Sequence, residues 1–232
     1  MSASATRFVI PVYPGTTHLD FTGPHQFFSR VPGAEVIVAS RAGGSLEMDG
    51  LVFSGLRRLA DVPACDVICV PGGFGTVDAI HDEAFMSEIR RLAAGARYVT
   101  SVCTGSIILA AAGLLAGKRA ACHWYWRELL GRFPGVTVDP ARVVRDGNVI
   151  TGGGVTAGID LALTVIAELA GTEVAQRIQL GLEYAPQPPF DCGRPETAGA
   201  DTVAALTAVF AERSATSRER VDSLLAKAPA GA

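Results

Sequence analysis

Short apolar runs alternate along the chain with segments of helical spacing, and this alternation is the feature that most constrains the fold. The runs RFVIPVY, EVIVAS, DVICVPGG and RYVTSV occupy residues 7–13, 35–40, 66–73 and 97–102. Because these strands are almost continuously apolar, they are expected to be covered on both faces. Helices between successive strands favour parallel pairing. The sequence therefore predicts a doubly wound parallel α/β sheet.

The remaining segments fit the same sheet without a second domain. A last helix is predicted at 201–226, after helices at 22–31, 82–95, 104–115, 155–171 and 172–182. Thr172 is a candidate N-cap, and Asp146-Gly147 within VVRDGNVIT predicts a hairpin. Residues 184–199 are proline-rich and predict a loop, and the terminal KAPAGA predicts a short flexible tail. We expect a single domain over residues 1–232, with its core at about 7–226.

Charge and cysteine content exclude several classes of protein. Hydrophobic residues make up 49% of the chain and charged residues 19%, enough for a sizeable core. The net charge is −3 without a basic block, so we expect no nucleic-acid or membrane partner. The five cysteines form no Cys-x-x-Cys pair, and the four histidines have no zinc spacing. With no evident signal peptide, reduced thiols and a cytoplasmic location are expected.

Three strand ends carry side chains or backbone groups suited to chemistry. In open α/β sheets, sites form at the carboxyl ends of strands near the point where strand order reverses. Asp20 follows the first strand, either as a turn carboxylate or as a carboxylate aimed at the site. Gly72 and Gly73 follow the third strand, either in a tight turn or as a cradle of backbone N–H groups.

Cys103 ends the fourth strand, and its position at a corner favours a functional role. A residue at a strand-to-helix corner exposes its side chain above the sheet, as in a nucleophile elbow. The N-terminus of the next helix favours a thiolate. The alternative, a small buried hydrophobe, is the interpretation we keep for Cys65, Cys69, Cys122 and Cys192.

Other motifs are better explained by packing. TGGGVTAG, at 151–158, lacks the spacing of a dinucleotide loop and predicts close contact between a strand and a helix. His25 and His123 are expected to be structural, the latter in the core or in a pocket wall. Arg142 and Arg145 are expected to be solvated beside the hairpin.

Seven motifs resemble the ThiJ/PfpI superfamily: LDFTGP, VPGGFG, YVTSVCTGS, CHW, VVRDGN, TGGGVTAGID and LEYAP, in order from Leu19 to Pro186. The resemblance implies a flavodoxin-like, class I glutamine amidotransferase-like fold. SVCTGS together with LDFTGP is most similar to the branch that hydrates isonitriles. Many superfamily members carry histidine after the elbow cysteine and glutamate near strand one, whereas this chain has Thr104 and Asp20.

The resemblance implies hydration of a small-molecule isonitrile by a cysteine nucleophile, without metal or cofactor, in a homodimer. Cys103 would attack the isonitrile carbon, and Asp20 would act as general acid–base. Thr104 would orient Asp20 or water, or donate its backbone N–H. Gly72 and Gly73 would donate N–H groups to developing negative charge. The apolar pocket would be shaped by Phe74, Trp124 and Tyr125.

Two other functions remain open from sequence alone. The CTG and DxxGP patterns also resemble the sensory domains of AraC-type regulators, which would use Cys103 for redox response or ligand binding. Those regulators carry a helix-turn-helix domain after this fold, and this chain has no basic DNA-reading module. Another cysteine-dependent hydrolase or a glyoxalase of the superfamily is the other alternative.

Overall fold

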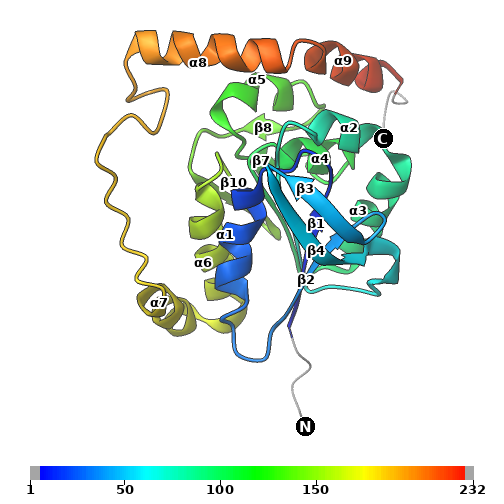
Figure 1. Ribbon diagram of the computed structural model, residues 1–232, viewed down its shortest axis with the longest axis vertical. Coiled ribbons are helices and arrows are strands. Elements are labelled where there is room, and N and C mark those ends of the chain that lie inside the picture. Colours follow the sequence, from blue (N-terminus) through cyan, green and yellow to red (C-terminus); the bar gives the residue numbers. More distant parts are fainter. Residues whose placement is uncertain (1–5, 228–232) are drawn as a thin grey trace.

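The computed structural model describes residues 6–227, and its centre is an eight-stranded sheet with the order β3-β4-β2-β1-β5-β6-β10-β9 (Figure 1). Neighbouring strands from β4 to β10 are parallel, and only the edge strands β3 and β9 are antiparallel to their neighbours. The predicted parallel α/β sheet is confirmed. The strands are β1 (Arg7–Val12), β2 (Glu35–Ser40), β3 (Gly44–Met48), β4 (Leu51–Arg58), β5 (Val67–Val70), β6 (Tyr98–Val102), β9 (Val143–Asp146) and β10 (Val149–Gly152).

Helices cover both faces of this sheet. Helices α1, α6 and α7 lie on one face, and α2, α3 and α4 lie on the other. Successive side chains of a strand point to opposite faces, so Phe8 and Ile10 of β1 enter one apolar core and Val9 enters the other. The helices are α1 (His18–Phe28), α2 (Thr76–His81), α3 (Glu83–Gly95), α4 (Gly105–Ala111), α5 (Arg127–Leu130), α6 (Ala157–Ala170), α7 (Thr172–Gly181), α8 (Ala200–Arg213) and α9 (Ser217–Lys227).

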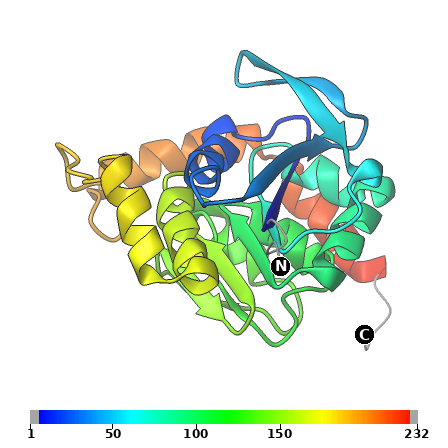
Figure 2. The same cartoon turned by 90° about the horizontal axis from the view of Figure 1, so that it is seen from below.

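Smaller elements complete the chain. A second, two-stranded sheet pairs β7 (Arg119–Ala120) with β8 (Thr137–Val138), and 3-10 turns lie at Leu59–Asp61 and Trp124–Trp126. The β3–β4 hairpin stands out from the body (Figure 2), and much of it is exposed. This hairpin was not predicted, because its exposed strands lack the continuous apolar run by which the central strands were found.

The structure corrects four predicted boundaries. The helix predicted at 104–115 is α4, which begins at Gly105 and ends at Ala111. The first helix begins at His18 and not at Thr22, which places Asp20 in its first turn. Gly171, with φ +92°, is the N-cap of α7, so Thr172 is the first helical residue. The predicted last helix is broken into α8 and α9 near Ser214. The predicted hairpin is confirmed as β9–β10, with Gly147 at φ +64° in its turn.

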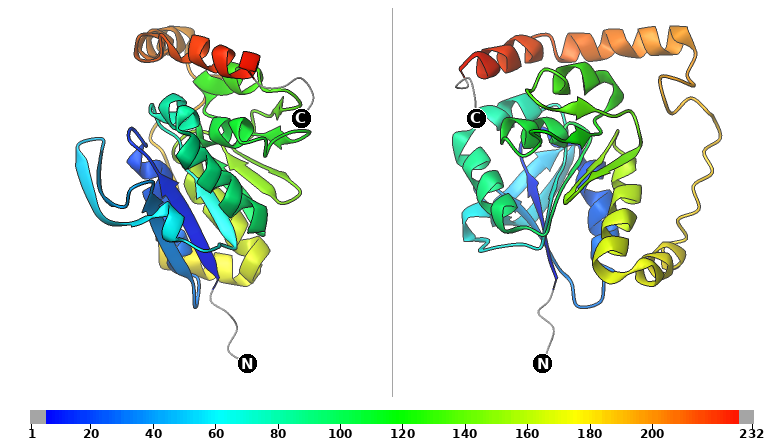
Figure 3. Two further views of the ribbon diagram at one scale, coloured as in Figure 1. Left: turned by 90° about the vertical axis from the view of Figure 1, so that its right-hand side faces the viewer. Right: turned by 180° about the vertical axis from the view of Figure 1, so that it is seen from behind.

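Residues 183–199 form the predicted loop, and we call this segment the strap. It runs along one side of the molecule from α7 to the opposite end, where α8 and α9 cross over α5 (Figures 1 and 3). The last five residues of the predicted tail lie outside the described part of the chain. Among residues 6–227 no helix is both long and apolar enough to cross a membrane.

Candidate active site

The sheet topology brings the predicted residues to one edge. Strand β1 lies between β2 and β5, so the order of the sheet reverses at β1, and β6 follows β5. Asp20 follows β1, Gly72 and Gly73 follow β5, and Cys103 follows β6. The carboxyl ends of these parallel strands meet at the switch point, where α/β proteins form their sites.

Cys103 occupies a sharp corner between β6 and α4. Its φ is +60°, in the left-handed region that non-glycine residues seldom adopt. Its N–H is anchored by Gly152 O at 3.1 Å and Gly153 O at 2.7 Å. A Cβ on Gly105 would lie 2.1 Å from Val70 O, so the chain turns here only because residue 105 is glycine. The corner matches the predicted nucleophile elbow.

Asp20 is a buried carboxyl beside this elbow. Its exposed fraction is 0%. Its Oδ2 accepts a hydrogen bond from Gly72 N at 2.9 Å, whereas its buried Oδ1 has no hydrogen-bond partner among the described residues. Burial raises the pKa of Asp20 to about 7, and the hydrogen bond from Gly72 N offsets only part of that rise. At neutral pH the carboxyl is therefore poised to accept or to release a proton.

The Cys103 side chain is a thiol and not a standing thiolate at neutral pH. Burial raises the pKa of Cys103 well above its usual value, and the charge of nearby Asp20 raises it further. The N–H of Thr104 favours the thiolate but is outweighed. This differs from the thiolate expected from the helix N-terminus, because α4 is short and burial dominates. The Asp20–Cys103 pair carries one proton when Asp20 is ionised.

Gly72, Gly73 and Thr104 hold the site together through hydrogen bonds within the protein. Gly72 N donates to Asp20, and Gly73 N donates to Thr104 Oγ1 at 2.8 Å. Both N–H groups are thus occupied, which differs from the free donors expected from sequence. The Thr104 hydroxyl bonds Gly73 and, at 2.7 Å, Thr76 Oγ1, and not Asp20.

Two residues that sequence reasoning missed complete this buried network. Tyr13 OH lies 3.0 Å from Thr76 Oγ1 and donates to Pro71 O at 3.0 Å. Thr76 Oγ1 also lies 2.8 Å from Gly73 O. Tyr13 ends the first apolar run and Thr76 follows VPGGFG directly, so their place beside strand ends was the available signal.

A cavity of about 100 Å³ opens onto Cys103. Its wall includes Phe74, as predicted, with His123, Trp126, Val155 and Phe210. The predicted lining residues Trp124 and Tyr125 do not reach this cavity. Both pack on the ring of Phe210, with centroid distances of 5.8 and 5.1 Å, and Trp124 lines a neighbouring cavity.

Phe210 comes from α8, which sequence analysis did not connect to the site. It contacts the ring of Phe74 at 6.0 Å and that of His123 at 5.4 Å, and Arg213 stacks on Phe74 at 3.7 Å. Burial lowers the pKa of His123 to about 4. His123 is therefore neutral at pH 7, in keeping with a residue of the pocket wall.

None of the other four cysteines lies at a corner between a strand of the central sheet and an α-helix. All five are free thiols; Cys65, Cys69 and Cys122 are buried, whereas Cys192 is exposed on the strap, contrary to expectation. No group of histidine, cysteine and acidic side chains suited to a metal is found within residues 6–227.

Comparison with known proteins identifies a protein family and several relatives that are similar to this chain in sequence or fold. The model of the DJ-1/PfpI family matches residues 6–168. An isonitrile hydratase of Pseudomonas putida is 50% identical over 188 residues, covering 81% of this chain and 82% of that protein. The crystal structure of a ThiJ/PfpI family protein from Pseudomonas syringae superposes with a TM-score of 0.88 at 38% identity, covering 95% and 90% of the two chains. The HTH-type transcriptional regulator CdhR of Pseudomonas aeruginosa is 30% identical over 143 residues, 61% of this chain and 42% of that protein.

Proposed function

The chain belongs to the DJ-1/PfpI family, and from this premise we propose that it is an isonitrile hydratase that converts an isonitrile and water into an N-substituted formamide. One observation carries the proposal: Cys103 lines a small, mostly apolar cavity, and the buried carboxyl of Asp20 lies beside the Cys103 thiol. The similarity to the Pseudomonas putida isonitrile hydratase supports the same reaction.

In the first step Cys103 adds to the terminal carbon of R–N≡C. Ionised Asp20 accepts the thiol proton as sulfur attacks and delivers that proton to the same carbon. The carbon thereby gains one C–S bond and one C–H bond. The product is the thioimidate R–N=CH–S–Cys103, and Asp20 is ionised again.

In the second step water replaces the cysteine. Asp20 accepts a proton from water as its oxygen adds to the thioimidate carbon, and that proton passes to nitrogen. The C–S bond then breaks, and the hydroxyl proton returns to sulfur as the C=O bond forms. The sum is R–NC plus water giving R–NH–CHO, with no change of redox state in the protein.

The test is a spectrophotometric assay with para-nitrophenyl isocyanide, with the formamide verified by mass spectrometry. We expect turnover by the wild-type protein and loss of turnover in Cys103→Ala and Asp20→Asn. Cys192→Ala, which removes an exposed thiol, is the matched control and should retain activity. Full activity in Cys103→Ala would overturn the covalent mechanism.

The same assay separates the two alternatives. Turnover of methylglyoxal without turnover of isonitriles would favour a glyoxalase. A protein without turnover of either, but with a Cys103 that is readily alkylated and a separate DNA-binding partner, would favour a sensory role like that of the regulator it resembles in part.

We also propose a homodimer in the cytoplasm that acts without a nucleic-acid partner. The resemblance to the family supports the dimer, and exposed apolar side chains occur at Val52, Leu180 and Phe190 on three separate segments. Light scattering on the purified protein should give twice the chain mass of 24.1 kDa. A mass of one chain at micromolar concentration would contradict the dimer.

A further inference from the structure

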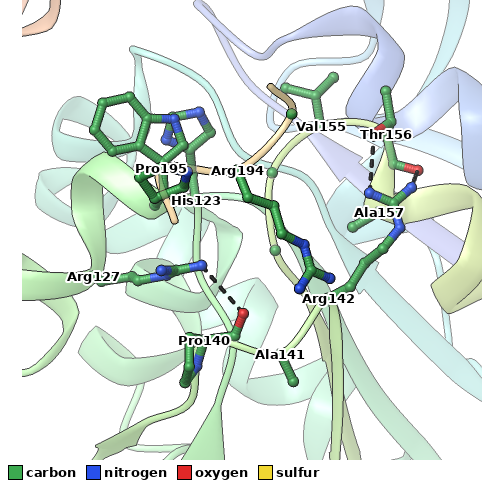
Figure 4. Close-up of a pocket in the computed structure, with 14 residues that line it drawn as sticks. His123, Arg127, Pro140, Ala141, Arg142, Val155, Thr156, Ala157, Arg194 and Pro195 are labelled. Atoms are coloured by element: carbon green, nitrogen blue, oxygen red, sulfur yellow. Dashed lines mark hydrogen bonds between the residues drawn. The ribbon is translucent and has the colours of Figure 1, made fainter. Parts of the chain in front are cut away.

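A second cavity adjoins the one at Cys103. Its volume is about 220 Å³, and His123 and Val155 contribute to the walls of both cavities. The apolar part of its lining includes Pro140 and Pro195 (Figure 4). A ligand whose reactive end lies at Cys103 would pass His123 and Val155 to enter this second space.

Three arginines give the second cavity its character, and we call it the arginine cavity. Arg127, Arg142 and Arg194 line it, and no acidic residue does. In the view of Figure 4 the Arg194 side chain extends from the strap into the space between the other two. Three like charges around one small cavity favour an anionic ligand.

Two of these arginines are partly neutralised from outside the cavity. Arg127 pairs with Glu196 at 2.8 Å, and Arg142 pairs with Asp160 and donates to Thr156 O at 2.9 Å. Arg127 Nε is nevertheless buried without a hydrogen-bond partner among the described residues.

Arg194 makes no ion pair within residues 6–227, so the cavity keeps an excess of one positive charge. The N-terminus of α6, capped at Thr156 in the cavity wall, adds a positive partial charge. A carboxylate fits this arrangement, because it carries one negative charge and accepts two hydrogen bonds from a guanidinium group.

We propose that the arginine cavity binds a carboxylate on the substrate, so that the isonitriles hydrated by this protein carry a carboxylate on the group attached to nitrogen. This inference rests on the proposed hydratase function. The isonitrile group is uncharged and suits the apolar cavity at Cys103. The charged end then lies beyond His123, where the guanidinium groups are.

The kinetic test compares ω-isocyanoalkanoates of increasing chain length with their methyl esters. We expect kcat/KM of the acid to exceed that of its ester at the chain length that spans the two cavities. Arg194→Gln should lower the ratio of acid to ester by about fivefold, mainly through KM, as for one partly exposed ion pair. Arg194→Lys should restore part of the ratio.

Arg57→Gln is the matched control, because Arg57 is an exposed arginine on β4 and the substitution changes the net charge equally. It should leave the ratio unchanged. An acid-to-ester ratio of one or less at every chain length, or a ratio unaffected by Arg194→Gln, would overturn the inference while the hydratase function stands.

A binding measurement keeps the inference testable if no isonitrile is turned over. Calorimetry with N-formyl-β-alanine and its methyl ester, on wild type and Arg194→Gln, uses ligands that resemble the product and do not react. We expect the acid to bind more tightly than the ester, with affinity that falls about fivefold in Arg194→Gln and falls in added salt. Equal affinity for acid and ester would overturn the arginine cavity as a carboxylate site.

Discussion

The pairing of Asp20 with Cys103 shows how burial sets chemistry at the scale of single residues. Neither side chain is activated by a neighbouring cation. Asp20 has a raised pKa because it is buried, and its contact with Gly72 N holds one of its oxygens in place. Its other oxygen is left without a partner, so the free acceptor is available for proton transfer. A residue with an ordinary aspartate pKa would be a much weaker acceptor at neutral pH.

The pKa of Asp20 predicts the pH dependence of catalysis. Below about pH 7 the carboxyl is protonated and cannot accept the Cys103 proton, so kcat/KM should rise with pH through about 7 and level off above it. A pH–rate profile from 5.5 to 8.5 with a neutral isonitrile measures this. In Asp20→Asn this rise should disappear, and kcat/KM should fall by at least about a hundredfold. A flat wild-type profile would contradict the assignment.

The same shift predicts that Asp20 destabilises the fold at high pH. The folded-state pKa of about 7 exceeds the ordinary aspartate pKa of 3.8, so the folded protein binds the proton more tightly than the unfolded chain. Stability is lost as pH rises from about 4 to 7, by up to about 4 kcal/mol. Asp20→Asn should therefore be more stable than wild type, by a larger margin at pH 8 than at pH 5.

Urea unfolding of both proteins at the two pH values provides the measurement. Asp191→Asn, at an exposed site on the strap, is the control for the loss of one carboxylate. Equal margins at pH 5 and pH 8 would show that the Asp20 carboxyl is not shifted upward.

The close packing around Gly72 predicts that a single added methyl group would disrupt the site. A Cβ at residue 72 would lie 2.4 Å from Thr104 N and 2.9 Å from Cys103 Cβ. Gly72→Ala should lower the free energy of unfolding by about 1–3 kcal/mol, as for overpacking, and abolish turnover by displacing the elbow. Gly181→Ala, where a Cβ meets nothing within 4 Å, should leave both unchanged. Urea unfolding and the isonitrile assay measure the two effects, and full activity in Gly72→Ala would contradict this explanation.

At the scale of elements, α8 is attached to the body through very few side chains. None of its residues is fully buried, and Leu206 and Val209 are exposed. Phe210 differs from the other residues of α8, because it packs among the rings of Phe74 and His123 and lines the cavity at Cys103. One aromatic side chain thus joins the helix to the site.

Replacing Phe210 should loosen substrate binding and leave the chemistry in place. Phe210→Ala removes apolar surface from the cavity wall, so KM for a neutral isonitrile should rise about threefold to tenfold with little change in kcat. Val209→Ala, at the neighbouring exposed position, is the control. Steady-state kinetics decides, and a fall in kcat at constant KM would place Phe210 in the chemistry instead.

For the molecule as a whole, the sequence predicted the elements whose buried residues recur in a regular apolar pattern. The central strands were found because their residues face two apolar cores, and Cys103 was found because it ends such a strand. The exposed β3–β4 hairpin carries no such pattern. Phe210 lies more than a hundred residues from Cys103 in the chain, and no local pattern reports a contact that the strap creates. The pKa of Asp20 likewise depends on burial by segments distant in sequence.

The division of the chain at residue 168 has a consequence for how such an enzyme can change. Asp20 and Cys103 lie inside the region matched by the family model, whereas Arg194 and Phe210 lie outside it, on the strap and α8. The proposed reacting pair and two of the proposed substrate contacts therefore lie on separate stretches of polypeptide, whereas Arg127, Arg142 and His123 lie inside the matched region. Exchange of the strap and α8 would therefore alter one wall of each of the two cavities, while the residues at the strand ends stay in place.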